Sequence, residues 1–274
     1  MEAIRKVDQS MLFVSEPNPF MFGNRNNDSS NPTWTNKNWL KSRFHFSFAE
    51  YHNRRNSHFG KMRVMNDDLV QPKRGFGAHP HANMEIVTYV VRGKLSHSDD
   101  QGNAESLGRH CTQFMSAGRG VVHSEFNASE DEPVRFIQMW FNPRKMNMPT
   151  RYGSTQGDPG ALQNQWQHLV SDDDSSFRTP VKIGQDINLY VTVLDENKEV
   201  DFHLRDDRQA YLLCIEGTVT VSGIDADEEL TTAELTQHDA SELFGDLHIS
   251  VRAEAPGSHV LLVEMKKDGS SRFA

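Results

Sequence analysis

The 274-residue sequence has little of what defines several common classes of protein. It contains two cysteines, Cys111 and Cys214, without a Cys-x-x-Cys spacing. That predicts no disulfide framework and no cysteine zinc site, and it suits a reducing compartment. Residues 11–14 form the one apolar run near the N-terminus, too short for a signal peptide, and no run approaches the roughly 18 residues of a membrane span. We therefore expect a cytoplasmic protein, with the nucleus as the second compartment, and no membrane partner.

Positive charge is also scarce. The chain has 29 Lys and Arg against 38 Asp and Glu, a formal net charge of −9. Such a balance gives no broad phosphate-binding face, so direct binding to nucleic acid is not expected. The hydrophobic fraction of 36% excludes a collagen-like or wholly disordered chain. A chain of this length can bury a sizeable core without disulfides.

Short β-type runs separated by turn residues fill the chain. Runs rich in β-branched and aromatic residues predict strands, and turn formers at 99–103 predict a hairpin. The run 86–91 has the composition of a strand buried on both faces. Both halves therefore predict an all-β sandwich or barrel. The predicted strands are 62–65, 86–91, 134–141, 187–194, 211–215, 218–221, 248–251 and 260–263.

Composition also suggests domain boundaries. Residues 1–36, rich in Asn and Ser, predict a loose N-terminal leader. A first domain then spans 37–150, a Gly- and Pro-rich linker spans 151–165, and a second domain spans 166–274. The halves align faintly when Gly93 is placed on Gly217, an offset of 217 − 93 = 124, which suggests a duplication.

Two stretches carry side chains suited to chemistry, residues 77–85 and 116–125. Residues i and i+2 of a strand share a face, so His79 converges with His81 and His123 with Glu125. If the two strands are neighbours in one barrel, three imidazoles and a carboxylate meet inside it. Such a set suits a divalent first-row metal, and the absence of thiolates disfavours structural zinc.

Other residues leave alternatives open. Glu85 lies an even number of residues after His79 and His81, so in a continuous strand it would face the same side. On this parity alone, Glu85 is either an alternative to Glu125 as the carboxylate ligand or a neighbour that orients a ligand. His97 and Cys111 lie between the two motifs, and each fits a packed strand position at least as well.

These motifs resemble the pirin family of the cupin superfamily. The resemblance covers most of residues 37–150 and rests on the blocks 39–51, 63–68, 76–81, 84–89 and 118–125. It implies a bicupin, two tandem jelly-roll-like β-barrels, whose N-terminal barrel holds one metal, usually iron. Carried over position by position, the metal ligands are His79, His81, His123 and Glu125. The family pattern therefore selects Glu125, whereas the general cupin pattern would select Glu85.

The second half resembles the family's C-terminal cupin only loosely. In the duplication alignment His79 falls on His203, but His81 falls on Arg205 and Glu125 on Ser250. We therefore expect no complete metal site in that barrel.

The resemblance also implies a function. It indicates a dioxygenase similar to quercetin 2,3-dioxygenase, which opens a flavonol-type enol with dioxygen at one divalent ion, Fe(II). Glu125 would be the catalytic base. The alternative is a non-catalytic iron-binding redox protein or transcriptional co-regulator, which would act through a protein partner.

Overall fold

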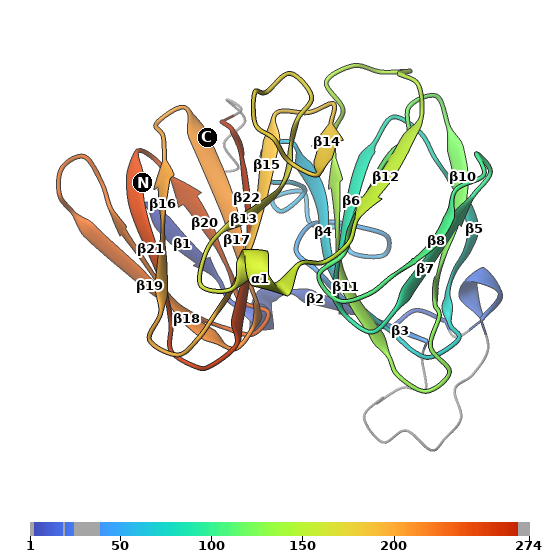
Figure 1. Ribbon diagram of the computed structural model, residues 1–274, viewed down its shortest axis with the longest axis horizontal. Helices are drawn as coiled ribbons and strands as arrows, with labels where there is room; N and C mark the ends of the chain where they lie inside the picture. The colour runs from blue at the N-terminus through green and yellow to red at the C-terminus, as the bar shows by residue number, and fades with distance from the viewer. Residues whose placement is uncertain (1–2, 19, 25–38, 268–274) are drawn as a thin grey trace.

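The computed structural model describes residues 3–18, 20–24 and 39–267, and these residues form two β-barrels side by side (Figure 1). Each barrel consists of a seven-stranded and a four-stranded sheet. The prediction of an all-β chain with two tandem barrels is confirmed. Among the described residues, no helix is both long and apolar enough to cross a bilayer.

The N-terminal barrel contains the two motifs singled out above. Its four-stranded sheet has the order β5 (Gly75–His81), β10 (Val121–Asn127), β7 (Leu95–Asp99) and β8 (Ala104–Leu107). The predicted hairpin at 99–103 joins β7 to β8. The seven-stranded sheet has the order β12 (Arg151–Thr155), β9 (Thr112–Ser116), β6 (Glu85–Arg92), β11 (Val134–Phe141), β4 (Met62–Val70), β3 (Leu40–Phe44) and β2 (Phe13–Ser15). As its composition predicted, β6 is buried on both faces along all but its last residue.

The C-terminal barrel has the same plan. Its four-stranded sheet has the order β16 (Glu199–Leu204), β21 (Leu247–Ala253), β18 (Thr218–Ile224) and β19 (Leu230–Thr236). The seven-stranded sheet has the order β1 (Ile4–Val7), β20 (Ala240–Phe244), β17 (Arg208–Glu216), β22 (Ser258–Lys266), β15 (Ile187–Leu194), β13 (Gln167–Asp172) and β14 (Val181–Ile183). The four-stranded sheets and the five inner strands of the seven-stranded sheets correspond in order, which supports the duplication, and the edge strands differ.

The N-terminal segment corrects the prediction of a loose leader. Within residues 1–36, β1 pairs antiparallel with β20 of the C-terminal barrel, and β2 pairs with β3 of the N-terminal barrel. Two single-turn 3-10 helices, η1 (Gln9–Met11) and η2 (Met21–Gly23), accompany these strands. Residues 25–38 lie outside the described part of the chain. Because β1 occupies the sheet edge that β12 occupies in the other barrel, the first residues complete the C-terminal domain.

The predicted linker 151–165 is likewise structured. Its first five residues form β12, the edge strand beside β9, and Pro159–Leu162 form the short helix α1. The side chain of Asp158 caps that helix by accepting hydrogen bonds from the backbone N–H groups of Gly160 and Ala161. The prediction failed here because Gly and Pro content marks turns, whereas an edge strand depends on its neighbour.

The largest core cluster joins the two barrels. Residues of β4, β6 and β11 pack against residues of β15, β17 and β22, so the seven-stranded sheets bury each other's faces (Figure 1). Phe59, Tyr89 and Phe141 from the first barrel and Tyr211 and Leu261 from the second are almost completely buried in it. Burial of this shared apolar surface stabilises the association of the two barrels.

A buried ion pair lies in the same interface. Both carboxylate oxygens of Asp67 accept hydrogen bonds from Arg135, at 2.8 and 2.7 Å, and Oδ2 lies 2.6 Å from Nδ1 of His238 in the C-terminal barrel. Arg135 also donates to the carbonyl of Ile215. Burial alone would raise the pKa of Asp67, but Arg135 and His238 hold it far below its ordinary value. The pair therefore ties β4 and β11 to the second barrel.

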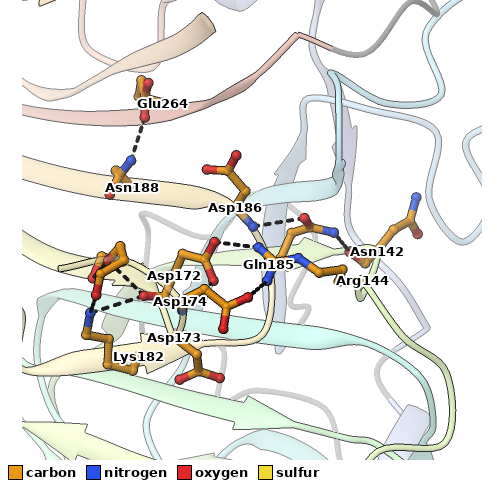
Figure 2. Close-up of polar contacts among 12 residues, drawn as sticks. Asn142, Arg144, Asp172, Asp173, Asp174, Lys182, Gln185, Asp186, Asn188 and Glu264 are labelled. Carbon is orange, nitrogen blue, oxygen red and sulfur yellow. Dashed lines mark hydrogen bonds and ion pairs between the residues drawn. The ribbon is translucent and has the colours of Figure 1, made fainter. Parts of the chain in front are cut away.

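A second polar junction joins the barrels at the surface (Figure 2). Arg144, which follows β11, forms ion pairs with Asp172 at the end of β13 and with Asp174. Beside it Gln185 donates a hydrogen bond to the backbone carbonyl of Asn142 at 2.6 Å. These contacts fix the segment 142–149 against the C-terminal barrel, and this segment contacts the turn that leads into β10.

Asp67→Asn tests the buried ion pair. The variant leaves the guanidinium of Arg135 buried without its counter-ion, which should cost about 3–5 kcal/mol of unfolding free energy. The matched control is Asp246→Asn, which removes an exposed pair with His203 and should cost under about 1 kcal/mol. Urea unfolding of both variants checks this, and equal losses would contradict the assigned role of Asp67.

Candidate metal centre

Antiparallel pairing of β5 with β10 places the predicted histidines opposite one another. His123 is the direct partner of His79, and Val121 is the partner of His81. Ala78 and Pro80 are exposed, whereas the histidines between and after them are partly buried and turn toward the barrel interior. The expectation that two separate strands would bring these imidazoles together is therefore met in the fold.

A glycine turn sets the direction in which β10 enters the sheet. Gly118 has φ +44°, and a Cβ at this position would lie 2.1 Å from the backbone oxygen of Met148. Its own carbonyl accepts a hydrogen bond from the N–H of Asn83, just after β5. Only glycine suits both the close approach and the left-handed conformation.

The three imidazoles form a compact cluster. One ring nitrogen of each of His79, His81 and His123 lies within 4.8 Å of the others, and the Nε2 atoms of His79 and His123 are 3.1 Å apart. Two metal ligands at right angles, each about 2.1 Å from an ion, lie about 3 Å apart. The spacing of the two nitrogens thus fits adjacent positions on one ion.

Hydrogen bonding and burial prepare these rings to act as ligands. Nδ1 of His79 lies 2.7 Å from the carbonyl of Gly77, and since a carbonyl only accepts, Nδ1 donates and the neutral ring presents its Nε2 lone pair. Burial, with the neighbouring imidazoles adding to it, lowers the pKa of His81 to about 4 and that of His123 to about 3. Both rings are neutral at pH 7, as metal binding requires.

Glu125 is held by two glutamines. Its Oε1 accepts a hydrogen bond from Gln113 at 2.9 Å, and its Oε2 accepts one from Gln138 at 2.8 Å. The β5–β10 register shifts between His123 and Glu125, which pairs with Phe76 instead of the expected Gly77. The buried carboxylate is thus fixed in place, and each oxygen keeps a lone pair for a further partner.

His97 occupies a packed strand position, as its sequence context favoured, and it also lies beside the histidine cluster. It is buried, and one of its ring nitrogens lies within 4.8 Å of ligand atoms of His123 and Glu125. Its ring stacks on Tyr152 with a centroid distance of 4.4 Å, and its Nε2 lies 3.3 Å from Asp99. His97 lies two residues from Leu95 and from Asp99 on β7, so the three side chains share one face of the strand. This parity was the signal in the sequence for its position. His123 therefore belongs to two overlapping groups, one with His79 and His81 and one with His97 and Glu125.

A cavity lies beside the cluster and is lined by members of both groups. It has a volume of about 190 Å³ and is lined by His79, His81 and Glu125, but His97 is not among its lining residues. Its apolar wall is aromatic, and Pro17, Met21 and Phe22 of the N-terminal segment contribute to it. The aromatic and apolar lining residues are Pro17, Met21, Phe22, Trp39, Leu40, Phe44, Phe48, Ala49, Phe76 and Trp140.

Glu85, the rival carboxylate, lies elsewhere. It accepts a hydrogen bond from Ser116, and it lines a different cavity with Arg151 and Asp173 at the junction of the barrels. It does not line the histidine cavity. Residues 82–84 interrupt the strand between His81 and Glu85. The even spacing of these two residues therefore does not place their side chains on the same face.

The C-terminal barrel does not repeat the cluster. His203 and His248 pair across β16 and β21 as His79 and His123 pair across β5 and β10, but both are exposed and stack at 4.4 Å on the outer face. The inward positions carry Leu204, Leu247 and Ile249. Among the described residues, no group of candidate metal ligands lies in this barrel. The sequence alignment of the two halves therefore matched outward-facing positions of the C-terminal barrel to inward-facing positions of the N-terminal barrel.

Comparison with known proteins identifies the family. The pirin family model matches residues 25–141, and a model described as the quercetinase C-terminal cupin domain matches residues 168–265. A quercetin 2,3-dioxygenase of Escherichia coli K12 is 34% identical over 230 residues, which cover 84% of this chain and 93% of that protein. The chain belongs to the pirin family.

Solved pirin structures have the same architecture. The crystal structure of YhhW from Escherichia coli is 28% identical, covers 98% of this chain and 100% of that one, and superposes with a TM-score of 0.78. The same bacterial pirin solved in complex with nickel(II) gives a TM-score of 0.77, with 97% of this chain and 100% of that one covered at 28% identity. A pirin-like protein of Caulobacter vibrioides is 35% identical over 68% of this chain and 79% of its own length.

Gly118→Ala tests the turn that orients β10. The new methyl group would meet the Met148 carbonyl and force a left-handed alanine, so we expect a loss of more than about 2 kcal/mol in unfolding free energy. Gly108→Ala is the control, since a Cβ there meets nothing within 4 Å, and it should change stability by less than about 0.5 kcal/mol. Chemical denaturation measures both, and a Gly118 variant as stable as the control would refute this account of the turn.

Proposed function

We propose that the protein is a metal-dependent dioxygenase that opens a flavonol-type enol, as quercetin 2,3-dioxygenase does. The observation that carries the proposal is the cluster of three imidazoles, with Glu125 beside His123 and lining the same aromatic cavity as His79 and His81. The 34% identity to a quercetin 2,3-dioxygenase over 84% of the chain supports it.

The proposed ligands are His79, His81, His123 and Glu125, and the proposed ion is Fe(II). Imidazoles with a carboxylate and open positions are typical of non-haem Fe(II) sites. Three of these four residues line the cavity, whereas His97 faces Tyr152 and Asp99 behind them, which favours this set over one that contains His97. When bound, the ion would act as a Lewis acid that lowers the pKa of the enol and orients it toward dioxygen.

The cavity walls would exclude water and hold a flat ring. Trp140 lies edge-on to His81 with a centroid distance of 4.7 Å and to Phe48 at 5.2 Å. Phe22 lies edge-on to His79 at 5.5 Å and to Phe76 at 5.7 Å. Aromatic edges on both sides of the histidines suit a planar polyphenol better than a flexible aliphatic substrate.

Glu125 is the proposed catalytic base. Its carboxylate, released from the ion, would take the proton of the substrate 3-hydroxyl onto one oxygen. The substrate enolate would then replace the carboxylate as the anionic ligand, so the net charge of +1 at the ion would stay the same. Gln113 and Gln138 hold the carboxylate in place for this transfer. The hydrogen bond from Trp140 Nε1 to Gln138, 3.0 Å, links the base to the cavity wall.

The cell compartment and the regulatory alternative stay predictions. Cys111 and Cys214 are free and buried, which suits the cytoplasm. If the protein is instead a redox co-regulator, it binds metal and a protein partner but does not consume flavonol, so turnover separates the two functions.

His81→Ala tests the ligand set. We expect the iron content of the iron-loaded protein to fall from about one ion per chain to below about 0.1, because an imidazole that binds the ion directly is lost. His97→Gln and the C-terminal control His203→Ala should keep about one ion. Elemental analysis after Fe(II), Ni(II) or Mn(II) loading measures this. Loss of metal in the His97 variant with retention in the His81 variant would establish the other set.

His123→Ala tests the activity. The variant removes the imidazole common to both groups, so aerobic quercetin turnover should fall at least about 10³-fold, and metal removal from the wild type should have the same effect. Loss of quercetin absorbance together with oxygen uptake follows the reaction. Wild-type protein with a full complement of iron that turns over no flavonol in a small panel would refute the dioxygenase proposal.

A further inference from the structure

Two consecutive aspartates on β4 face opposite sides of the sheet. Asp67 faces the interface between the barrels, where Arg135 and His238 neutralise it. Asp68, the next residue, must face the interior of the N-terminal barrel because side chains alternate along a strand. There it lines the same cavity as His79, His81 and Glu125.

Asp68 has no cation beside it in this cavity. Its side chain is buried, with 3% of the residue exposed, and no Lys or Arg is among the residues that line the cavity. Its partner on β3 is Ser42, and its partner on β11 is Phe136. Among the described residues Asp68 makes no ion pair, in contrast to Asp67.

The other titratable groups that face the cavity are engaged elsewhere. Glu50, after β3, accepts a hydrogen bond from Ser15, and Glu125 on β10 accepts from two glutamines. The remaining groups are His79 and His81 on β5. Asp68 is neither adjacent in sequence nor hydrogen-bonded to any of the four proposed metal ligands.

A carboxyl in such a place is held neutral. Burial, reinforced by the nearby charges of Asp67 and Glu125 and opposed by Ser42, raises the pKa of Asp68 to about 8. At pH 7 the group therefore carries a proton and can donate a hydrogen bond. A buried donor on a cavity wall is unfavourable unless it finds an acceptor, and a bound ligand can supply one.

We propose that Asp68 is a substrate-binding residue whose neutral carboxyl donates a hydrogen bond to an oxygen of the flavonol-class ligand in this cavity. The proposal rests on the proposed function for the class of ligand, but not on turnover. It makes Asp68 a specificity-determining group. A site built to hydrogen-bond an oxygen rejects analogues that lack it, because its own polar group is then left unpaired.

The test is anaerobic binding of quercetin to the metal-loaded protein, followed by the shift of its visible absorbance between pH 6 and 9. Asp68→Asn keeps the size and a donor, so its Kd at pH 7 should lie within about threefold of the wild-type value, whereas Asp68→Leu should weaken binding more than about tenfold. From pH 7 to 9 the wild-type Kd should rise about tenfold relative to that of Asp68→Asn, because only the wild type has a carboxyl at position 68 that loses its proton in this range. Asp201→Asn, on exposed β16, is the matched control and should match the wild type at every pH.

Thermal unfolding without ligand gives a second readout. The folded pKa lies above the unfolded value of about 3.9, so the wild type loses stability as pH rises from about 4 to about 8, whereas Asp68→Asn does not. The melting temperature of Asp68→Asn should therefore exceed that of the wild type by an amount that grows across this range. A constant difference would overturn the neutral carboxyl even if the leucine variant fails to fold.

The outcomes separate this proposal from the proposed function. Flavonol binding with the expected variant pattern but without turnover would refute the dioxygenase and keep Asp68. Wild-type affinity in Asp68→Leu, or no flavonol binding by the wild type, would overturn the role given to Asp68. Loss of binding in Asp68→Asn at pH 7 equal to the loss in Asp68→Leu would also overturn it, since an amide retains the donor.

Discussion

The pairing of β5 with β10 is the constraint on which the site depends. It places His79 directly opposite His123, with their Nε2 atoms 3.1 Å apart inside the barrel. Such an approach of two buried imidazoles is unfavourable for two protonated rings, and burial keeps His123 neutral. The glycine turn at 118–120, the Gly77 carbonyl and the glutamines around Glu125 all serve this one arrangement.

The two barrels share a plan but differ in what they place inside. Strands β16 and β21 pair His203 with His248 in the same way, yet these rings lie outside and Leu204, Leu247 and Ile249 fill the interior. Because side chains alternate along a strand, a shift of one residue moves the histidines from the inner face of the barrel to the outer face. The C-terminal barrel instead supports the first one: its sheet buries β4, β6 and β11, and His238 helps to neutralise Asp67.

Much of this arrangement follows from local sequence. The alternation His79–His81, the spacing from His123 to Glu125 and the β-branched run in β6 predicted strands and the side chains that share a face of each. The two tandem barrels, and the convergence of the two histidine strands in one of them, were implied by the family resemblance. The carboxylate was not predictable from parity, because residues 82–84 break the strand before Glu85. Nor were the positions of β1 and β12, since an edge strand is selected by a partner distant in the sequence. The nearness of His97 to His123 was not predictable either, because it depends on the pairing of β7 with β10.

A crystal of the iron-loaded protein, with an anomalous difference map at the iron edge, tests the central claim most directly. We expect a single peak in contact with Nε2 of His79 and with His81, His123 and Glu125, at about 2.0–2.2 Å from each ligand atom. A peak bounded by His97, His123 and Glu125 with His79 and His81 unliganded, or no peak in the N-terminal barrel, would contradict it.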